Sequence, residues 1–152
     1  MIEIVAVGRR IDPDLKVAVA DYESRLRGPY KVDWRFLPYS KSQGDEAGRD
    51  EGQRILRVVD DSSYVVLLDE RGENVSSPDL SAKLESIQVQ SGRRVVFVVG
   101  GAYGVSQSVF DRADFIWSLS KLVLPHRIVH LVLVEQIYRA QEIARGGPYH
   151  HL

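Results

Sequence analysis

Two stretches in the second half of the chain have residue types suited to holding a ligand. Residues 100–104 read GGAYG, and such glycines either let the backbone approach a ligand closely or simply form a tight turn. Residues 118–126 read SLSKLVLPH, which is largely apolar for a connecting segment. This segment either plugs the core or forms an apolar wall for a flat ring. The GxGxxG and GxxxxGK[ST] patterns are absent, so dinucleotide-binding and P-loop sites are not expected.

Candidate acid–base groups gather near the C-terminus. A long helix is expected from about Pro125 to Arg145, and its apolar residues on more than one face need cover on both sides. Glu135 interrupts that surface as either a paired ion or a functional carboxylate. After the helix stop at Gly146–Gly147, the tail PYHHL carries Tyr149 and two histidines. This tail is either a frayed end or a functional segment.

The residue inventory limits the chemistry. His126 and His130 stand four residues apart on the expected helix, but no third ligand has a recognised spacing, so no metal ion is expected. The chain has no cysteine, which excludes disulfides, thiolate metal sites and cysteine nucleophiles. Methylation of a pyrimidine ring carbon generally needs such a nucleophile. Methylation of a ring nitrogen or a ribose oxygen does not.

The elements that would position these residues alternate between strands and helices. Apolar runs or alternating apolar residues predict strands at residues 2–7, 30–36, 64–69, 94–99 and 115–120. Helices are expected after the capping residues Asp12, Ser77 and Ser106, with another helix ending at ILRVV.

This alternation predicts the α/β class. We expect one domain over residues 1–152, with a mainly parallel sheet flanked by helices. Ligands of such sheets lie beyond the carboxyl ends of the strands. The turns after Leu68, Val99 and Ser118 should therefore meet at one rim.

The bulk composition is that of a globular protein. The 152 residues are 44% hydrophobic and 27% charged, and the net charge of −1 gives no general attraction to nucleic acid. Basic residues outnumber acidic ones from Trp117 onward, which also suits solvated helix positions. The opening apolar run is expected to be a strand rather than a secretory signal, and no run approaches the ~20 residues of a membrane span. We therefore expect a cytoplasmic protein.

Several stretches, in their order along the chain, resemble the RlmH-type ribosomal RNA methyltransferases of the SPOUT superfamily. The matching stretches are IEIVAVG, DEGQRIL, VVLLDERGE, VVGGAYG, WSLSKLVLPH, EQIYRAQ and PYHHL. The resemblance covers essentially the whole chain. It is most specific in the second half, where a glycine turn, an apolar LPH loop and a PYH tail follow one another.

The resemblance implies a fold and an activity. The fold is an α/β knot, a C-terminal trefoil in which the last segment threads a loop of the chain, although knots are otherwise nearly absent from proteins. The implied enzyme is a homodimer that uses S-adenosylmethionine to methylate N3 of a pseudouridine in large-subunit (23S) ribosomal RNA of the assembled ribosome. By position, the cofactor-contacting residues of the family correspond to Leu68, Gly100, Leu119, Ser120, Lys121, Leu122, Val123 and Leu124.

The chemistry of that reaction agrees with the composition. A ring-nitrogen anion attacks the sulfonium methyl group directly, so positioning supplies much of the catalysis and no cysteine is needed. The ring N–H is weakly acidic, so a base or a cationic stabiliser is required, and His150, Tyr149 and Arg139 are the candidates. A ribosome that supplies a preformed pocket also removes the need for a large basic face.

Two other functions remain open. A related enzyme that methylates another RNA, such as a transfer RNA ribose, is disfavoured because those enzymes usually differ in their C-terminal tails. A ribosome-assembly protein without turnover would not need the cofactor, so S-adenosylmethionine binding separates it from the enzymes. The sequence leaves open which group is the base and whether the tail acts in its own subunit or in a partner.

Overall fold

The computed structural model describes residues 1–151 and has one five-stranded sheet. Its strands are β1 (Ile2–Val7), β2 (Val32–Leu37), β3 (Tyr64–Glu73), β4 (Val95–Val99) and β5 (Phe115–Trp117). They pair in the order β2-β1-β4-β3-β5, and every pairing is parallel. The predicted α/β class with a parallel sheet is confirmed. The knot stays a prediction.

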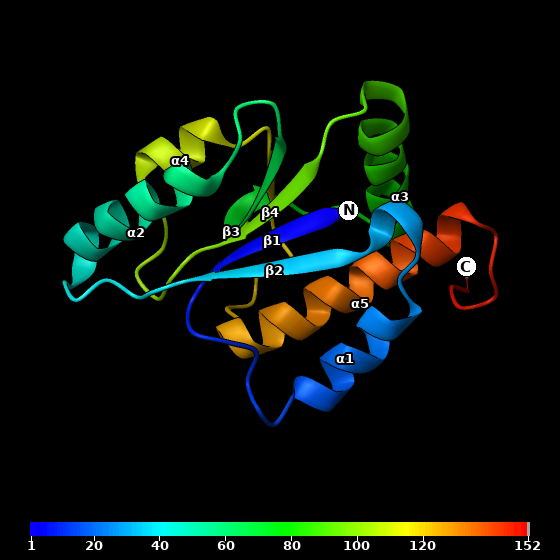
Figure 1. Ribbon diagram of the computed structural model, residues 1–152, viewed down its shortest axis with the longest axis horizontal. Coiled ribbons are helices and arrows are strands. Elements are labelled where there is room, and N and C mark those ends of the chain that lie inside the picture. Colours follow the sequence, from blue (N-terminus) through cyan, green and yellow to red (C-terminus); the bar gives the residue numbers. More distant parts are fainter. Residues whose placement is uncertain (152) are drawn as a thin grey trace.

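Helices cover both faces of this sheet, as parallel strands require. They are α1 (Lys16–Arg25), α2 (Gly44–Val58), α3 (Ser77–Glu85), α4 (Gln107–Arg112) and α5 (His126–Ala144). Figure 1 shows α2 and α4 together on one side and α1 and α5 together on the other. Neighbouring residues of β4 enter different cores: Val98 packs with Ile55 of α2, and Phe97 packs with Leu133 of α5. Among residues 1–151, no helix is long and apolar enough to cross a bilayer.

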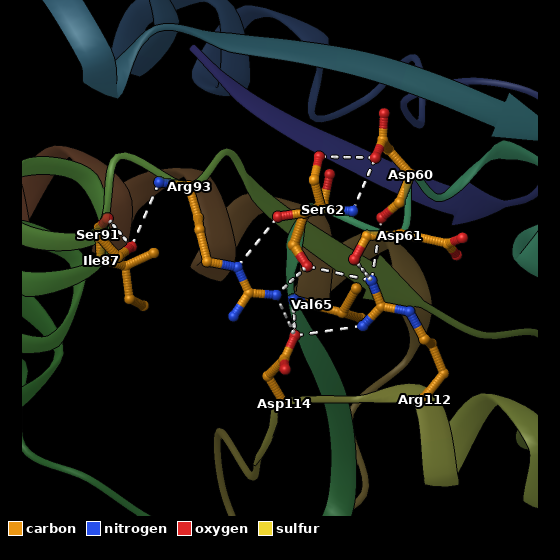
Figure 2. A network of polar contacts seen from close by, with 10 residues as sticks. Asp60, Asp61, Ser62, Val65, Ile87, Ser91, Arg93, Arg112 and Asp114 are labelled. Atoms are coloured by element: carbon orange, nitrogen blue, oxygen red, sulfur yellow. Dashed lines mark hydrogen bonds and ion pairs between the residues drawn. The ribbon is translucent and has the colours of Figure 1, made fainter.

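A polar network holds the amino-terminal ends of two strands together (Figure 2). Asp114, just before β5, accepts hydrogen bonds from the Val65 N–H at 2.8 Å, from Arg112 at 3.2 Å and from Arg93 at 3.4 Å. Both arginines also donate to the Ser63 carbonyl, at 3.1 and 2.6 Å. The network ties the starts of β3 and β5 to each other.

Two helices begin at residues other than those expected. Ser77 is the first residue of α3, and the cap is Ser76, whose hydroxyl accepts the Asp79 N–H at 3.1 Å. Helix α1 does not start directly after Asp12, because the Asp12 carboxylate accepts the Asp14 N–H at 2.8 Å and closes a turn first. In both places several short polar residues compete for the same role, and the predicted caps Asp12 and Ser77 are wrong.

Two strands end several residues away from the expected position. Strand β3 continues to Glu73 where a turn was expected, and β5 ends at Trp117 instead of residue 120. Leu68 and Glu73 both pair with Trp117, so the residues between them form an irregular excursion. A Cβ on Gly72 would lie 2.5 Å from the Ile116 carbonyl oxygen, so this close approach requires glycine. The shorter β5 leaves residues 118–125 outside the sheet, beside its carboxyl edge.

Candidate active site

Residues 68–71 of β3 and the segments that follow β4 and β5 meet around a cavity of about 660 Å³. These strands are neighbours in the sheet, so the residues after Leu68, Val99 and Ser118 reach the same rim as predicted, although those after Leu68 belong to β3 and do not form a turn. Seven of the eight residues predicted to contact a cofactor line this cavity: Leu68, Gly100, Leu119, Ser120, Leu122, Val123 and Leu124. Lys121 belongs to the same loop, but it is exposed and does not line the cavity.

The glycine turn after β4 presents backbone to the cavity. A Cβ on Gly100 would lie 2.6 Å from Cγ1 of Val105, so a side chain at this position would displace the turn. Gly104 has a φ of 78°, in the left-handed region, and its N–H donates to the Gly101 carbonyl at 3.1 Å. The segment is therefore a tight turn and a wall of the cavity at once.

The loop after β5 is held in shape by hydrogen bonds around its serines. The Ser118 hydroxyl donates to the Ser120 carbonyl, and the Ser120 hydroxyl accepts the Leu122 N–H, both at 2.9 Å. The Asn74 side chain donates to the Ser118 carbonyl at 2.9 Å. Leu122 and Val123 remain 74% and 83% exposed beside the cavity. Side chains this exposed do not plug a core, so that interpretation is wrong for them and they form an apolar wall.

These features fit an adenosine-type cofactor. Small-molecule sites are typically roughly 300–1,000 Å³, mostly apolar, with a few placed polar groups. The cavity has that size, an exposed apolar wall at Leu122 and Val123, and glycine backbone in its wall at Gly100, Gly101 and Gly104. A flat ring against the wall, with main-chain groups at its edge, matches this arrangement.

The two histidines near the start of α5 have different surroundings. His126 lines the cavity, and burial lowers its pKa. His130 is 5% exposed and lies edge-on against Trp34 and Phe36, where burial lowers its pKa to about 4. Neither ring nitrogen of His130 has a hydrogen-bond partner within residues 1–151. His130 is thus a packing residue.

The C-terminal tail folds back onto α5. Arg139 donates to the Glu135 carboxylate at 3.0 and 2.7 Å, and its Nη1 lies 3.1 Å from Nδ1 of His150. The Tyr149 hydroxyl donates to Glu135 at 3.0 Å, and the Arg139 guanidinium lies 4.7 Å from the centre of the Tyr149 ring. The three predicted catalytic residues therefore form one cluster with Glu135, the tail cluster. The interpretation of residues 148–150 as a frayed end is wrong.

Hydrogen bonding restricts what each group of the tail cluster can do. An arginine only donates, so Nδ1 of His150 is the acceptor and the neutral ring carries its proton on Nε2. Burial raises the pKa of Tyr149, so its hydroxyl stays protonated at neutral pH and is no base. Both oxygens of Glu135 already accept hydrogen bonds, one from Arg139 and Tyr149 and the other from Gln136. Glu135 is therefore suited to positioning Arg139 rather than to taking a proton.

Comparison with known proteins identifies the family. A family model described as "Predicted SPOUT methyltransferase" matches residues 1–150. The chain belongs to this SPOUT methyltransferase family. It is also similar to proteins named Ribosomal RNA large subunit methyltransferase H. The protein of Syntrophotalea carbinolica is 40% identical over 97% of each chain. The proteins of Carboxydothermus hydrogenoformans and Halothermothrix orenii are 38% and 35% identical, each over 98% of both chains. As a SPOUT methyltransferase, the chain is an enzyme with a methyl donor of the S-adenosylmethionine type.

Sequence reasoning missed the part that α2 plays in this SPOUT site. A Cβ on Gly48 would contact the Gly104 carbonyl at 3.8 Å, and one on Gly52 would lie 3.1 Å from Cβ of Ser106. These glycines let α2 pack directly against the glycine turn, with Glu51 buried between them. Residues 40–53 are polar and contain glycine, which favours a mobile loop leading into the helix that ends at ILRVV, but α2 already begins at Gly44, so that interpretation is wrong.

One chain of the SPOUT enzyme keeps the cavity and the tail cluster apart. Val129 lines the cavity and Arg139 belongs to the cluster, a separation of about 15 Å along α5 at ~1.5 Å per residue. Figure 1 shows the start of α5 and the C-terminus at opposite ends of this helix. Within one chain, the predicted cofactor residues and the predicted catalytic residues do not meet.

Proposed function

We propose that this SPOUT enzyme transfers a methyl group from S-adenosylmethionine to N3 of a pseudouridine in 23S ribosomal RNA of the assembled ribosome. The observation that carries the proposal is the cavity at the ends of β3, β4 and β5, in a chain up to 40% identical to proteins named for methylation of large-subunit ribosomal RNA. The chain acts in the cytoplasm. It forms one domain over residues 1–152, because all five strands belong to one sheet.

The cofactor is held mainly by backbone. Main-chain groups of the Gly100 turn and of residues 119–124 read the edge of the adenosine, while Leu122 and Val123 cover its face and exclude water. When bound, the cofactor supplies an electrophilic methyl group on a sulfonium sulfur, which becomes a neutral thioether on transfer. The chain's task is to align that methyl group with the ring nitrogen, and alignment is worth up to roughly 7–11 kcal/mol.

The tail cluster supplies the proton chemistry. The Arg139 guanidinium places a positive charge where the ring nitrogen loses its proton, which favours the anion. Nδ1 of His150 is an acceptor, so it takes the ring proton once Arg139 turns from it to the substrate. Glu135 keeps Arg139 oriented through its two hydrogen bonds, and the Tyr149 ring offers a face for stacking.

A homodimer brings the two parts of the site together. Ile128, Val132, Glu135 and Arg139 are half-buried and recur every three or four residues, so they share one face of α5. Helices α1 and α3 pack against α5, whereas Ile128 and Val132 belong to neither core. Two such faces packed antiparallel about a two-fold axis place the tail cluster of one chain at the cavity of its partner.

Methylation of defined ribosomes tests the proposed function. Purified protein with labelled S-adenosylmethionine should add one methyl group to 23S RNA in ribosomes from cells that lack this gene. Mass spectrometry should place it on a pseudouridine. Naked 23S RNA should be a poor substrate. Methylation of transfer RNA instead, or cofactor binding without any transfer to ribosomes, would contradict the proposal.

A further inference from the structure

Glu51 is a buried acid without a cation. The residue is 4% exposed, and its Oε2 accepts the Ser40 N–H at 2.9 Å. Its Oε1 has no hydrogen-bond partner, and none of the ion pairs within residues 1–151 includes Glu51. Burial of a carboxylate is costly unless a cation or several donors compensate. One of the two carboxylate oxygens is therefore without a donor from the chain itself.

The unpartnered oxygen faces the wall of the cavity. A Cβ on Gly101 would collide with Oε1 of Glu51, so the carboxylate occupies the space that a side chain at position 101 would take. Gly101 lines the cavity, as does His126, and the charge of Glu51 raises the pKa of His126 against the lowering effect of burial. Glu51 thus lies directly behind the glycine turn, close enough to act electrostatically on a group in the cavity.

Most of the charged residues in the cavity wall are negative, like Glu51. Asp45, Asp69 and Glu70 line it, and the one arginine in the wall, Arg71, already pairs with Asp69 at 2.8 Å. Charges interact more strongly through a buried, low-dielectric region than through water. The buried Glu51 therefore contributes more per charge to the potential inside the cavity than the exposed Asp45 or Glu70.

We propose that Glu51 is a positioning residue that stabilises the positive sulfonium of bound S-adenosylmethionine from behind the glycine turn. The cavity thereby distinguishes the cationic methyl donor from its neutral product, S-adenosylhomocysteine. On transfer the sulfur keeps the electron pair of the broken S–C bond and loses its charge, so this stabilisation disappears when the product must leave. The inference rests on the proposed use of S-adenosylmethionine.

Calorimetry with both ligands tests the role of Glu51. Glu51→Gln keeps an oxygen that can accept the Ser40 N–H and removes only the charge. Affinity for S-adenosylmethionine should fall about tenfold, whereas affinity for S-adenosylhomocysteine should change less than about twofold. Glu51→Asp, which keeps the charge, should retain most of the wild-type preference. Glu46→Gln removes an exposed charge from the same helix and should leave both affinities unchanged.

The outcomes are distinguishable. Equal loss of both ligands in Glu51→Gln, or no loss of either, overturns the proposal, because the residue would then only support the turn or do nothing for binding. If Glu51→Gln does not fold, the test uses the wild-type chain and sinefungin, an analogue with a charged amine in place of the methylated sulfur. Sinefungin should then bind more tightly than S-adenosylhomocysteine. Equal affinities of these two analogues overturn the proposal. A folded wild-type chain that binds none of the three ligands overturns the proposed function instead.

Discussion

The Nη1 atom of Arg139 lies 3.1 Å from Nδ1 of His150, which ties the C-terminal tail to the surface of α5. The same guanidinium donates to Glu135 and lies over the ring of Tyr149. His150 therefore has a defined tautomer and a defined place, although it follows a double-glycine helix stop. The side chains proposed for proton transfer are arranged before any substrate is present, which is the condition for efficient acid–base catalysis.

Removal of the His150 imidazole should slow methyl transfer without affecting the cofactor. We expect His150→Ala to lower the single-turnover rate on ribosomes at least about tenfold, equivalent to ~1.4 kcal/mol in the barrier. S-Adenosylmethionine affinity should stay unchanged because the proposed cofactor contacts come from the Gly100 turn and residues 119–124 and not from His150. His151→Ala, at the adjacent exposed histidine, is the control and should retain the wild-type rate. Full activity of His150→Ala would assign the base elsewhere.

The apolar wall should contribute to cofactor affinity but not to folding. Leu122→Ser removes a side chain that is 74% exposed, so the free energy of unfolding should change by no more than about 0.5 kcal/mol. Loss of its contact with the adenosine ring should weaken S-adenosylmethionine binding about tenfold. Val17→Ser is the matched control, because Val17 is 82% exposed on α1 and lies far from the cavity residues along the sequence. Unchanged affinity in Leu122→Ser would remove the wall from the binding site.

Mixed dimers test whether the tail serves the partner's cavity. Gly100→Trp should block one cavity, since even a Cβ there meets Val105, and His150→Ala should disable one tail. A dimer of two Gly100→Trp chains and a dimer of two His150→Ala chains should each be nearly inactive. Co-expressed chains should regain about a quarter of the wild-type rate, because random pairing makes half of the dimers mixed, each with one intact site. Ultracentrifugation should show dimers throughout, and no regained activity in mixed dimers would place the tail's action within its own chain.

His130 should make the folded state sensitive to acid. Its pKa is lowered to about 4 in the folded chain, so between pH 6.5 and 4 the unfolded chain binds a proton that the folded chain does not. The free energy of unfolding should therefore fall as the pH drops, by about 2 kcal/mol from this residue between pH 7 and pH 5. Urea unfolding at the two values measures it. His130→Phe should lose this component, whereas His151→Gln should keep it; equal pH dependence in His130→Phe and wild type would disprove the assignment.

Much of the architecture was predictable because it depends on neighbours along the chain. The runs IEIVAV and RVVFVV have no polar alternation, which is typical of strands covered on both faces, and they form the buried centre of the sheet. Strand–helix alternation then requires parallel pairing, and parallel pairing brings the ends of β3, β4 and β5 to one rim. The positions of the glycine turn and of the loop at residues 118–126 follow from this order alone. The sequence by itself thus determined where the cavity is.

Tertiary structure decided which side chains work together. Sequence patterns record local burial, and they contain no information on which distant segment supplies a partner. His130 is a packing residue because Trp34 and Phe36 of β2 face it, and Glu51 belongs to the site because Gly48 and Gly52 allow α2 to approach the glycine turn. The choice between Ser76 and Ser77 as a cap and the folding of the tail onto Arg139 have the same origin. Hydrogen bonds and side-chain packing act only over a few ångströms, so they are set when the chain folds and not by spacing along it.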